Sequence, residues 1–297
     1  MRMKLTILGS ASHIPTRHRN QNGYFLETRE ETLLFDPGEG IQRQFTLAGI
    51  SPGRVERIFI SHFHGDHCLG LPGMMQRLSL MEVPHPLKIY FPEEGLEYMQ
   101  ALSKASKFTA RIEFEFHPLK AGLCEENAKW RIEAHELLHS TPVLGYRIIE
   151  KTRWHFIPQR LREAGLEVAE IALLEKSGRI LKKGKTILRE DLSCRDNGKI
   201  FAYALDTAPC SAIPELIREA DCLLMEGTYL RSEQALADAF LHMTAEQAGE
   251  YARDHGVKKL VLTHYSERYK DIAAYKKAVV KVFENTHIAK DFDIIEI

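Results

Sequence analysis

The stretch Ser61-His-Phe-His-Gly-Asp-His67 decides the fold of this chain, because it packs three histidines and an aspartate directly after an apolar run. That run, Arg57–Ile60, is typical of a buried strand. His62 and His64 share one side at period two, and the glycine after them lets the backbone curl. Imidazole and carboxylate ligands suit zinc, with manganese or iron also possible. The motif therefore predicts a binuclear metal site.

Size and composition are those of an ordinary globular protein. With 297 residues, 44% hydrophobic and 27% charged, the chain can form one large domain or two small ones. No apolar run approaches the roughly 20 residues needed to span a bilayer, and residues 1–8 resemble a strand rather than a signal peptide. We therefore expect a cytoplasmic protein without a membrane partner. The five cysteines form no CxxC pair, which argues against a disulfide framework or a zinc–cysteine site.

Strand-like runs alternate with amphipathic helices along the chain, which predicts a mixed α/β architecture. Three of the strands end at a residue that can bind a metal. In open α/β sheets functional sites gather at strand ends, so these residues are expected to form one composite site with the histidine motif. The strands and their following residues are Trp130–Leu138 before His139, Lys199–Leu205 before Asp206, and Lys258–Thr263 before His264.

Residues 151–199 differ in character from the rest of the chain. They contain 12 lysines or arginines against 7 acidic residues, whereas the whole chain has 40 basic and 41 acidic residues. A nucleic-acid partner is therefore not indicated by bulk charge, only by this local excess. Two interpretations stay open: a solvated excursion without function, or an inserted arm that contacts a polyanion.

Several motifs together resemble the metallo-β-lactamase superfamily and, within it, the ribonuclease Z family. The resemblance implies one αββα sandwich domain over residues 1–297, with 151–199 as an inserted basic segment and candidate substrate-binding arm. HxHxDH alone indicates only the superfamily, whereas the last two motifs point to the nuclease branch. The motifs are LGSASHIPTRHRN, FDPGEG, SHFHGDH, LLHSTPVLGYR, ALDT, MEGTY, HMTAEQA and LTHYSERY.

The resemblance implies two Zn²⁺ ions per chain, with a hydroxide bridging them as the nucleophile. Two divalent cations a few ångströms apart need a shared anion, and a carboxylate at a strand end can supply it. The implied ligands are His62, His64 and His139 for one metal, Asp66, His67 and His264 for the other, and Asp206 as the bridge.

Each ligand at a strand end has an alternative interpretation. His139 could cap a helix, and His135 in the same strand is a rival ligand. Asp206 could be an N-cap, although several residues separate it from the next expected helix. His264 could be a buried histidine that only makes hydrogen bonds. The position at a strand end favours ligation in all three cases.

Three side chains are candidates for the catalytic steps. Asp66 is expected to orient or deprotonate the attacking water, as the resemblance also implies. His242 is the candidate general acid or phosphate contact on the leaving-group side. Glu226 could hydrogen-bond His242 and raise its proton affinity, or it could simply face water. Thr244 fits a capping box that starts a helix running to Arg253.

Substrate contacts are harder to predict. Arginines beside an electron-rich pocket can bind phosphates in a bidentate manner, but they can equally be ordinary surface charges. The candidates are Arg17, Arg19, Arg268 and Tyr269.

The resemblance implies a zinc endoribonuclease that removes 3′ trailers from transfer RNA precursors and assembles as a homodimer. Three departures from the family pattern bear on the substrate: no glycine–proline pair occurs in the expected arm over 166–185, Met225 replaces a common histidine, and Ala208 replaces a frequent arginine. The alternative is therefore a hydrolase of small phosphodiesters or other esters on the same binuclear site. A non-catalytic binding module is a third hypothesis, disfavoured because every ligand position is filled.

Overall fold

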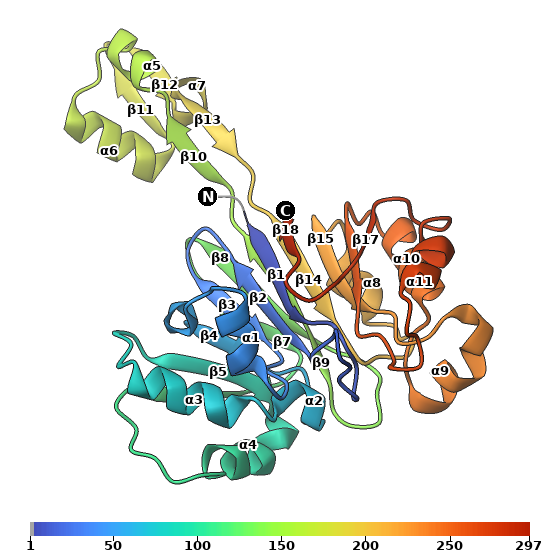
Figure 1. The fold of residues 1–297 in the computed structure, drawn as a ribbon. Coiled ribbons are helices and arrows are strands. Elements are labelled where there is room, and N and C mark those ends of the chain that lie inside the picture. The colour runs from blue at the N-terminus through green and yellow to red at the C-terminus, as the bar shows by residue number, and fades with distance from the viewer. Residues whose placement is uncertain (1–2) are drawn as a thin grey trace.

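The computed structural model describes residues 3–297, and its centre is a pair of seven-stranded sheets packed face to face (Figure 1). In spatial order, the first sheet contains β18 (Ile294–Glu296), β1 (Lys4–Gly9), β2 (Gly23–Glu27), β3 (Thr32–Phe35), β4 (Arg57–Phe59), β5 (Leu87–Pro92) and β6 (Phe114–Leu119). The second contains β17 (Thr286–Ile288), β16 (Leu260–Thr263), β15 (Cys222–Glu226), β14 (Ile200–Ala204), β9 (Leu144–Glu150), β8 (Trp130–Glu136) and β7 (Gly122–Glu126).

Helices cover the outer face of each sheet, so the predicted αββα sandwich is confirmed. No helix among residues 3–297 is long and apolar enough to cross a membrane. On the first sheet lie α1 (Ile41–Leu47), α3 (Leu71–Leu80) and α4 (Leu96–Ser103), with the single-turn α2 (Gly65–Cys68) beside them. On the second lie α8 (Ile213–Ile217), α10 (Ala245–Asp254) and α11 (Ala273–Val279), and α9 (Gln234–Phe240) follows β15. The short 3₁₀ helices are η1 (Pro52–Arg54), η2 (Glu93–Gly95) and η3 (Arg231–Glu233).

The strands are apolar on both faces because each face is covered. In β3, Leu33 and Phe35 belong to the core between the sheets, whereas Leu34 packs under the helices. The Phe35 ring stacks on Tyr203 of β14 with centroids 4.7 Å apart, which joins the two sheets. Continuous apolar runs are therefore what this architecture requires of its central strands.

Parallel strands bring functional residues to one edge. β3, β4 and β5 run parallel in the first sheet, and β14, β15 and β16 run parallel in the second. The segments that follow β4, β14 and β16 carry the histidine motif, Asp206 and His264. One predicted boundary is wrong: β8 ends at Glu136, not at Leu138. Leu138 instead forms a bridge with Ala208, which draws the loop after β8 toward the loop of Asp206.

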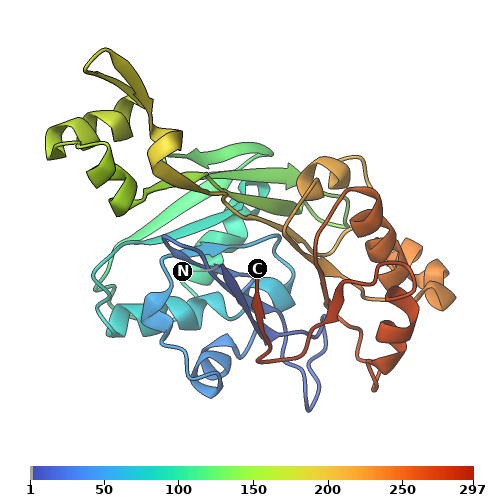
Figure 2. The same ribbon diagram turned by 90° about the horizontal axis from the view of Figure 1, so that it is seen from above.

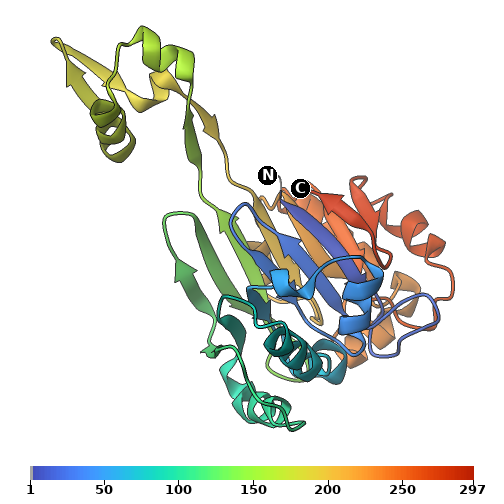
Figure 3. The same ribbon diagram turned by 60° about the vertical axis from the view of Figure 1, so that its left-hand side comes forward.

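The arm, residues 151–199, stands away from both sheets in all three views (Figures 1, 2 and 3). Its first and last strands pair antiparallel as a stem. The two strands between them form a hairpin that, with three helices, makes up the outer part, and Leu174, Ile180 and Leu192 are the buried residues of its own small core. The elements are β10 (Arg153–Phe156), α5 (Pro158–Glu163), α6 (Val168–Ser177), β11 (Arg179–Lys182), β12 (Lys185–Leu188), α7 (Arg189–Leu192) and β13 (Ser193–Asp196).

Candidate metal centre

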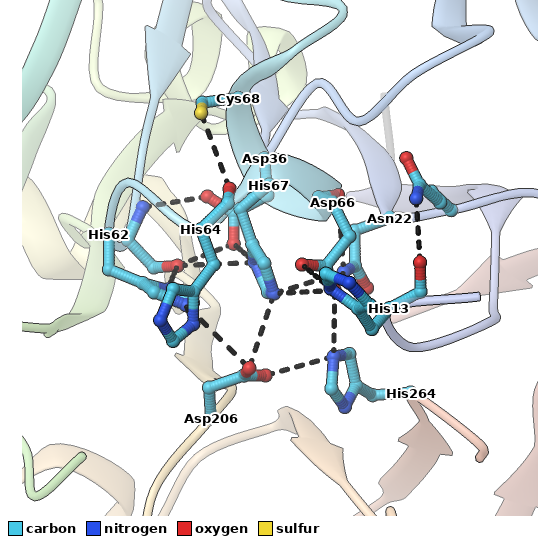
Figure 4. Close-up of polar contacts among 12 residues, drawn as sticks. His13, Asn22, Asp36, His62, His64, Asp66, His67, Cys68, Asp206 and His264 are labelled. Carbon is cyan, nitrogen blue, oxygen red and sulfur yellow. Dashed lines mark hydrogen bonds and ion pairs between the residues drawn. The ribbon is translucent and has the colours of Figure 1, made fainter. Parts of the chain in front are cut away.

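The structure brings the seven predicted metal-binding side chains to one place at the edge of the two sheets, and Figure 4 shows all of them except His139 labelled. They form two groups, in each of which one nitrogen or oxygen atom from every residue lies within 4.8 Å of the others. Asp206 belongs to both groups, so its carboxylate stands between them. The first group is His62, His64, His139 and Asp206, and the second is Asp66, His67, Asp206 and His264.

Distances around Asp206 describe a tight cluster of facing ligand atoms. Its Oδ2 lies 3.6 Å from Nε2 of His62, 3.4 Å from Nε2 of His67 and 3.8 Å from Nε2 of His139. Its Oδ1 lies 3.0 Å from Nε2 of His264. Oδ2 therefore faces histidines of both groups, whereas Oδ1 faces His264 of the second group, so the carboxylate contacts both sets of imidazoles.

The backbone turns sharply at the strand ends that deliver these side chains. Asp36 after β3, Asp206 after β14 and His264 after β16 have φ angles of 45°, 49° and 62°. Asp and His adopt this left-handed conformation more readily than most residues, although it costs about 1–3 kcal/mol for a side-chain-bearing residue. Such strain at three neighbouring positions is typical of a functional site that the surrounding fold holds in place.

Four histidine rings are oriented by a hydrogen bond at the nitrogen that faces away from Asp206. Nδ1 of His62 lies 2.9 Å from Ser61 Oγ, and Nδ1 of His139 lies 3.1 Å from the Leu241 carbonyl. Nδ1 of His264 lies 2.8 Å from Thr228 Oγ1. The fourth ring, of His67, is held by Asp36. This arrangement fixes the Nε2 lone pairs toward the centre, which is the usual way proteins orient metal-binding histidines.

Asp36 is a buried carboxylate that the sequence reasoning did not identify as functional. Its Oδ2 lies 2.6 Å from His67 Nδ1 and accepts hydrogen bonds from Ser61 Oγ (2.6 Å) and Tyr203 OH (2.5 Å). Its Oδ1 accepts a hydrogen bond from the Ser61 amide at 2.6 Å. Asp36 therefore positions both His67 and the start of the histidine motif. The available signal was the polar break Asp36-Pro-Gly directly after an apolar strand.

The charges at the centre depend on one another. Burial would raise the pKa of the Asp66 carboxyl, but the adjacent His67 and His264 outweigh it and hold that pKa well below its usual range. Burial would also raise the pKa of Asp206, but His264 and His67 outweigh it and hold that pKa well below its usual range. Conversely, burial lowers the pKa of His264, but Asp206 raises it to about 10. These carboxylates and histidines therefore stabilise one another's charged forms, and binding of a cation among them would compete with protons.

The residues fit a divalent cation. Asp206 Oδ1 and His264 Nε2 are buried atoms that make no hydrogen bond, despite lying 3.0 Å apart. Buried polar atoms without partners are costly, and coordination would satisfy them. His62 Nε2 and His64 Nδ1 also face each other at 3.0 Å, as two nitrogens converging on one ion do. Nitrogen and oxygen donors of this kind bind several divalent metals.

A second polar cluster adjoins the centre on the side of His264. Glu226 is fully buried and accepts hydrogen bonds from the Thr207 amide (2.6 Å) and from Thr228 Oγ1 (2.5 Å). Both of its oxygens lie 3.1 Å from Nδ1 of His242. Burial opposes a charge on His242, but the Glu226 carboxylate outweighs it and raises the pKa of the imidazole. The pair can therefore hold a proton next to the centre.

The cluster opens into a pocket of about 400 Å³ whose lining includes Asp66, Asp206, His242 and Arg268. The other predicted substrate-binding residues do not line it. Arg17 is exposed on a loop. The Arg19 guanidinium donates hydrogen bonds to the Ser266 and Tyr269 carbonyls, so it holds two loops together. Tyr269 OH donates to Glu233 Oε2 at 2.6 Å and accepts from the Leu230 amide at 3.0 Å, which occupies its hydroxyl.

Three other sequence expectations can be compared with the structure. The rival ligand His135 is in neither group, and its Nε2 lies 3.8 Å from Glu133. The capping box at Thr244 is confirmed, since its Oγ1 accepts a hydrogen bond from the Gln247 amide at the start of α10. Met225, which replaces a common histidine of the family, is buried under the outer helices and does not line the pocket.

Two further polar residues of the site went unnoticed in the sequence. Nδ2 of Asn22 donates a hydrogen bond of 3.2 Å to Asp66 Oδ2, and His13 Nδ1 lies 3.5 Å from Asp66 Oδ1 (Figure 4). Neither sits in a recognisable ligand spacing, because each comes from a loop distant in sequence from Asp66. Their contacts nevertheless restrict how the Asp66 carboxylate can turn.

This fold and this cluster define a metal-dependent hydrolase of the metallo-β-lactamase class. Residues 16–155 match the model of the metallo-beta-lactamase superfamily, and residues 151–265 match that of the beta-lactamase superfamily domain. Among solved structures, the short form of human tRNase Z superposes with a TM-score of 0.74, 99% coverage of both chains and 23% identity. The YhfI protein of Bacillus subtilis has a TM-score of 0.71, 18% identity, and coverage of 99% of this chain and 98% of its own.

Sequence similarity is higher among relatives named ribonuclease Z. The protein of Chlamydia trachomatis is 42% identical over 289 residues, which cover 97% of this chain and 95% of the relative. That of Nocardia farcinica is 40% identical over 282 residues, covering 94% and 92%. The chain belongs to the ribonuclease Z family.

Proposed function

We propose that the protein is an endoribonuclease that removes 3′ trailers from transfer RNA precursors in the cytoplasm. The observation that carries the proposal is near-full-length similarity to ribonuclease Z relatives, combined with a cluster of all seven proposed ligand side chains, five of which line an open pocket. The substrate is inferred from the ribonuclease Z family, whereas the cluster of side chains supports metal-dependent hydrolysis.

The metal assignment is two zinc ions, with manganese or iron as alternatives. His62, His64 and His139 would bind one ion, Asp66, His67 and His264 the other, and Asp206 would bridge them. This division follows the two geometric groups, both of which include Asp206. When bound, such a pair activates the attacking water and neutralises charge on the phosphate.

Asp66 is proposed to orient the attacking water and accept its proton. The carboxylate is nearly buried, yet its pKa is held low against burial by His67 and His264, so it remains ionised at neutral pH. Asn22 and His13 restrict its rotation. A fixed, charged acceptor beside the metal centre meets the geometric requirement for a base.

His242 is proposed to protonate the leaving oxygen, with Glu226 as the residue that orients it. Because the carboxylate raises the pKa of His242, the imidazole stays protonated to higher pH than an ordinary histidine. Its ring lies 5.0 Å from that of His139 and 5.6 Å from that of His264, and it lines the pocket, which suits a donor that acts on the departing group.

Substrate contacts are assigned unequally among the four predicted residues. Arg268 lines the pocket and donates one hydrogen bond, from Nη1 to Glu233 Oε2 at 3.0 Å, so its other guanidinium nitrogens make it the proposed phosphate contact. Arg17, on an exposed loop, is a second candidate. For Arg19 and Tyr269 we propose a supporting role, because their polar atoms are engaged within the protein.

The arm is proposed to bind the RNA at a distance from the metal centre. Its excess of five positive charges and its projection beyond both sheets support this role. Exposed apolar side chains on it, Val168 and Leu181 among them, supply surface on which bases can pack. Deletion of residues 151–199 should abolish RNA cleavage and preserve hydrolysis of a small phosphodiester. Equal loss of both activities in a folded protein would contradict the proposal.

A homodimer is also proposed, as in the family. Leu47 at the end of α1 and Leu80 and Met81 at the end of α3 are exposed apolar residues on adjacent helices, which suits a contact with a second copy. Sedimentation analysis at micromolar concentration tests this, and a monomer there would contradict it.

Incubation with a transfer RNA precursor that carries a 3′ trailer tests the function directly. We expect a metal-dependent cut just after the discriminator nucleotide, and no cut after chelation. A metal-loaded protein that hydrolyses a simple phosphodiester but leaves the precursor intact would instead support the small-substrate alternative.

A further inference from the structure

The chain enters and leaves the arm at one point on the second sheet. β9 ends at Glu150 before the arm, and the returning chain reaches β14 through Asn197, Gly198 and Lys199. We call the segments that enter and leave the arm, at Glu150 and at residues 196–199, the two crossings. They are in contact, because the Glu150 amide donates a hydrogen bond of 2.9 Å to the Lys199 carbonyl. A Cβ on Gly198 would lie 1.7 Å from the Glu150 carbonyl oxygen, so only glycine permits this approach.

Arg29, in the turn between β2 and β3 of the other sheet, contacts both crossings. Its amide donates to Glu150 Oε1 at 3.0 Å, and its Nε lies 3.3 Å from Glu150 Oε2. Its Nη2 donates to Asp196 Oδ1 at 2.8 Å and to the Asn197 carbonyl at 3.1 Å. The Arg29 side chain is 12% exposed and that of Glu150 is 5% exposed, so this ion pair is largely shielded from water, whereas Asp196 is 41% exposed.

The neighbouring Glu30 contacts the outgoing strand of the stem. It forms an ion pair with Arg153, the first residue of β10, and a second of 2.5 Å with Lys129 just before β8. Arg29 thus contacts the end of β13, and Glu30 contacts the start of β10. We call these two adjacent residues of one turn the latch.

A latch is physically useful because the stem is thin. β10 and β13 pair over only four residues, and a two-stranded ladder has little rigidity of its own. Four residues of strand extend about 13 Å, so a tilt of about 15° at the base moves the far end of the stem by about 3 Å and the outer helices by more. A shift of this size is enough to misplace a substrate held at both ends.

We propose that the latch sets the angle of the arm and so determines whether RNA held by the arm reaches the metal centre. The inference builds on the proposed function, because it assigns Arg29 and Glu30 as positioning residues for an RNA substrate. Neither residue lines the metal pocket, so neither contacts the metal centre directly.

The test compares Arg29→Gln with Arg218→Gln, which removes an arginine from an exposed pair with Glu215. Three assays are made on each zinc-loaded protein. They measure kcat and KM for a transfer RNA precursor, the rate of hydrolysis of bis(p-nitrophenyl) phosphate, and the hydrogen-exchange rates of the β10 and β13 amides. Arg29→Gln should raise KM for RNA roughly tenfold, equivalent to about 1.4 kcal/mol of binding, and accelerate exchange in both strands. Diester hydrolysis by Arg29→Gln should match that of the wild type, and Arg218→Gln should match the wild type in every measurement. Arg29→Lys, which keeps the charge, should have a KM for RNA between those of Arg29→Gln and the wild type.

Each contrary result has a separate meaning. Unchanged RNA kinetics in Arg29→Gln overturn the latch, whatever the exchange rates. A parallel loss of diester hydrolysis also overturns it, because the arginine would then support the body of the protein. If the wild type does not cut RNA at all, the proposed function fails, and unchanged exchange in β10 and β13 would additionally show that Arg29 does not hold the stem.

Discussion

Replacing Asp36 by asparagine should weaken both folding and metal binding, although Asp36 is not a proposed ligand. The substitution is conservative in shape, and asparagine tolerates the left-handed backbone at φ 45° as well as aspartate does. What changes is hydrogen bonding, since the carboxylate receives the Ser61 amide on Oδ1 and three further contacts on Oδ2.

The magnitude follows from these contacts. We expect the asparagine oxygen to replace Oδ2, so that its NH₂ group faces the Ser61 amide and that hydrogen bond is lost. The other bonds lose their charge assistance, and bonds to charged groups are worth about 1.5–3 kcal/mol against about 1 kcal/mol for neutral ones. The expected loss is about 3 kcal/mol in the free energy of unfolding. Because His67 also loses its anchoring carboxylate, zinc affinity should fall roughly 10–100-fold.

Two assays measure these effects: urea unfolding of the metal-free protein, and zinc titration against a chromophoric chelator. Asp221→Asn is the matched control, since Asp221 accepts the Ile200 amide at 2.9 Å and pairs with Lys199 but is remote from the metal centre. The control should lose stability without losing zinc affinity. An Asp36→Asn protein with wild-type zinc affinity would refute the claim that Asp36 orients His67.

Three further substitutions make separate predictions. Asp66→Ala should abolish hydrolysis without unfolding the protein, because this ligand lies on top of the core, and circular dichroism with a turnover assay checks both parts; normal turnover would exclude Asp66 from the mechanism. His242→Ala should lower kcat by roughly 10²–10⁴ for an alkyl leaving group but far less for nitrophenolate, which departs without a proton; equal losses would remove the general-acid role. Burial raises the pKa of Asp291 to about 6, so the folded state binds its proton more tightly than the unfolded chain does, and stability from this group falls by about 2 kcal/mol as pH rises from about 4 to about 6. Urea unfolding at both pH values should show that fall in the wild type relative to Asp291→Asn, and parallel curves would contradict it.

The clustering of the proposed ligands could be predicted because most of them follow a strand in the sequence. Apolar runs before His62, Asp206 and His264 indicate strands, and parallel strands of one sheet present their ends at the same edge. The fold class follows from the same pattern, helped by the family motifs. Local sequence thus carried most of the information about the metal-binding side chains.

Residues that act through contacts distant in sequence could not be predicted. Asp36 reaches His67 across 31 positions only because β3 and β4 are parallel neighbours. Arg19 was expected at the substrate, but it binds the Tyr269 carbonyl, 250 positions away. Arginine offers the same donors to a phosphate and to a carbonyl, so spacing cannot distinguish these partners. The predicted end of β8, Leu138, was wrong for a similar reason, because Leu138 pairs with Ala208, which is distant in sequence.

The central claim is that one carboxylate bridges two cations, and anomalous diffraction from a crystal of the zinc-loaded protein tests it most directly. We predict two zinc peaks about 3.5–4 Å apart on either side of Asp206, one among His62, His64 and His139 and the other among Asp66, His67 and His264. A single peak, or peaks away from Asp206, would contradict the account.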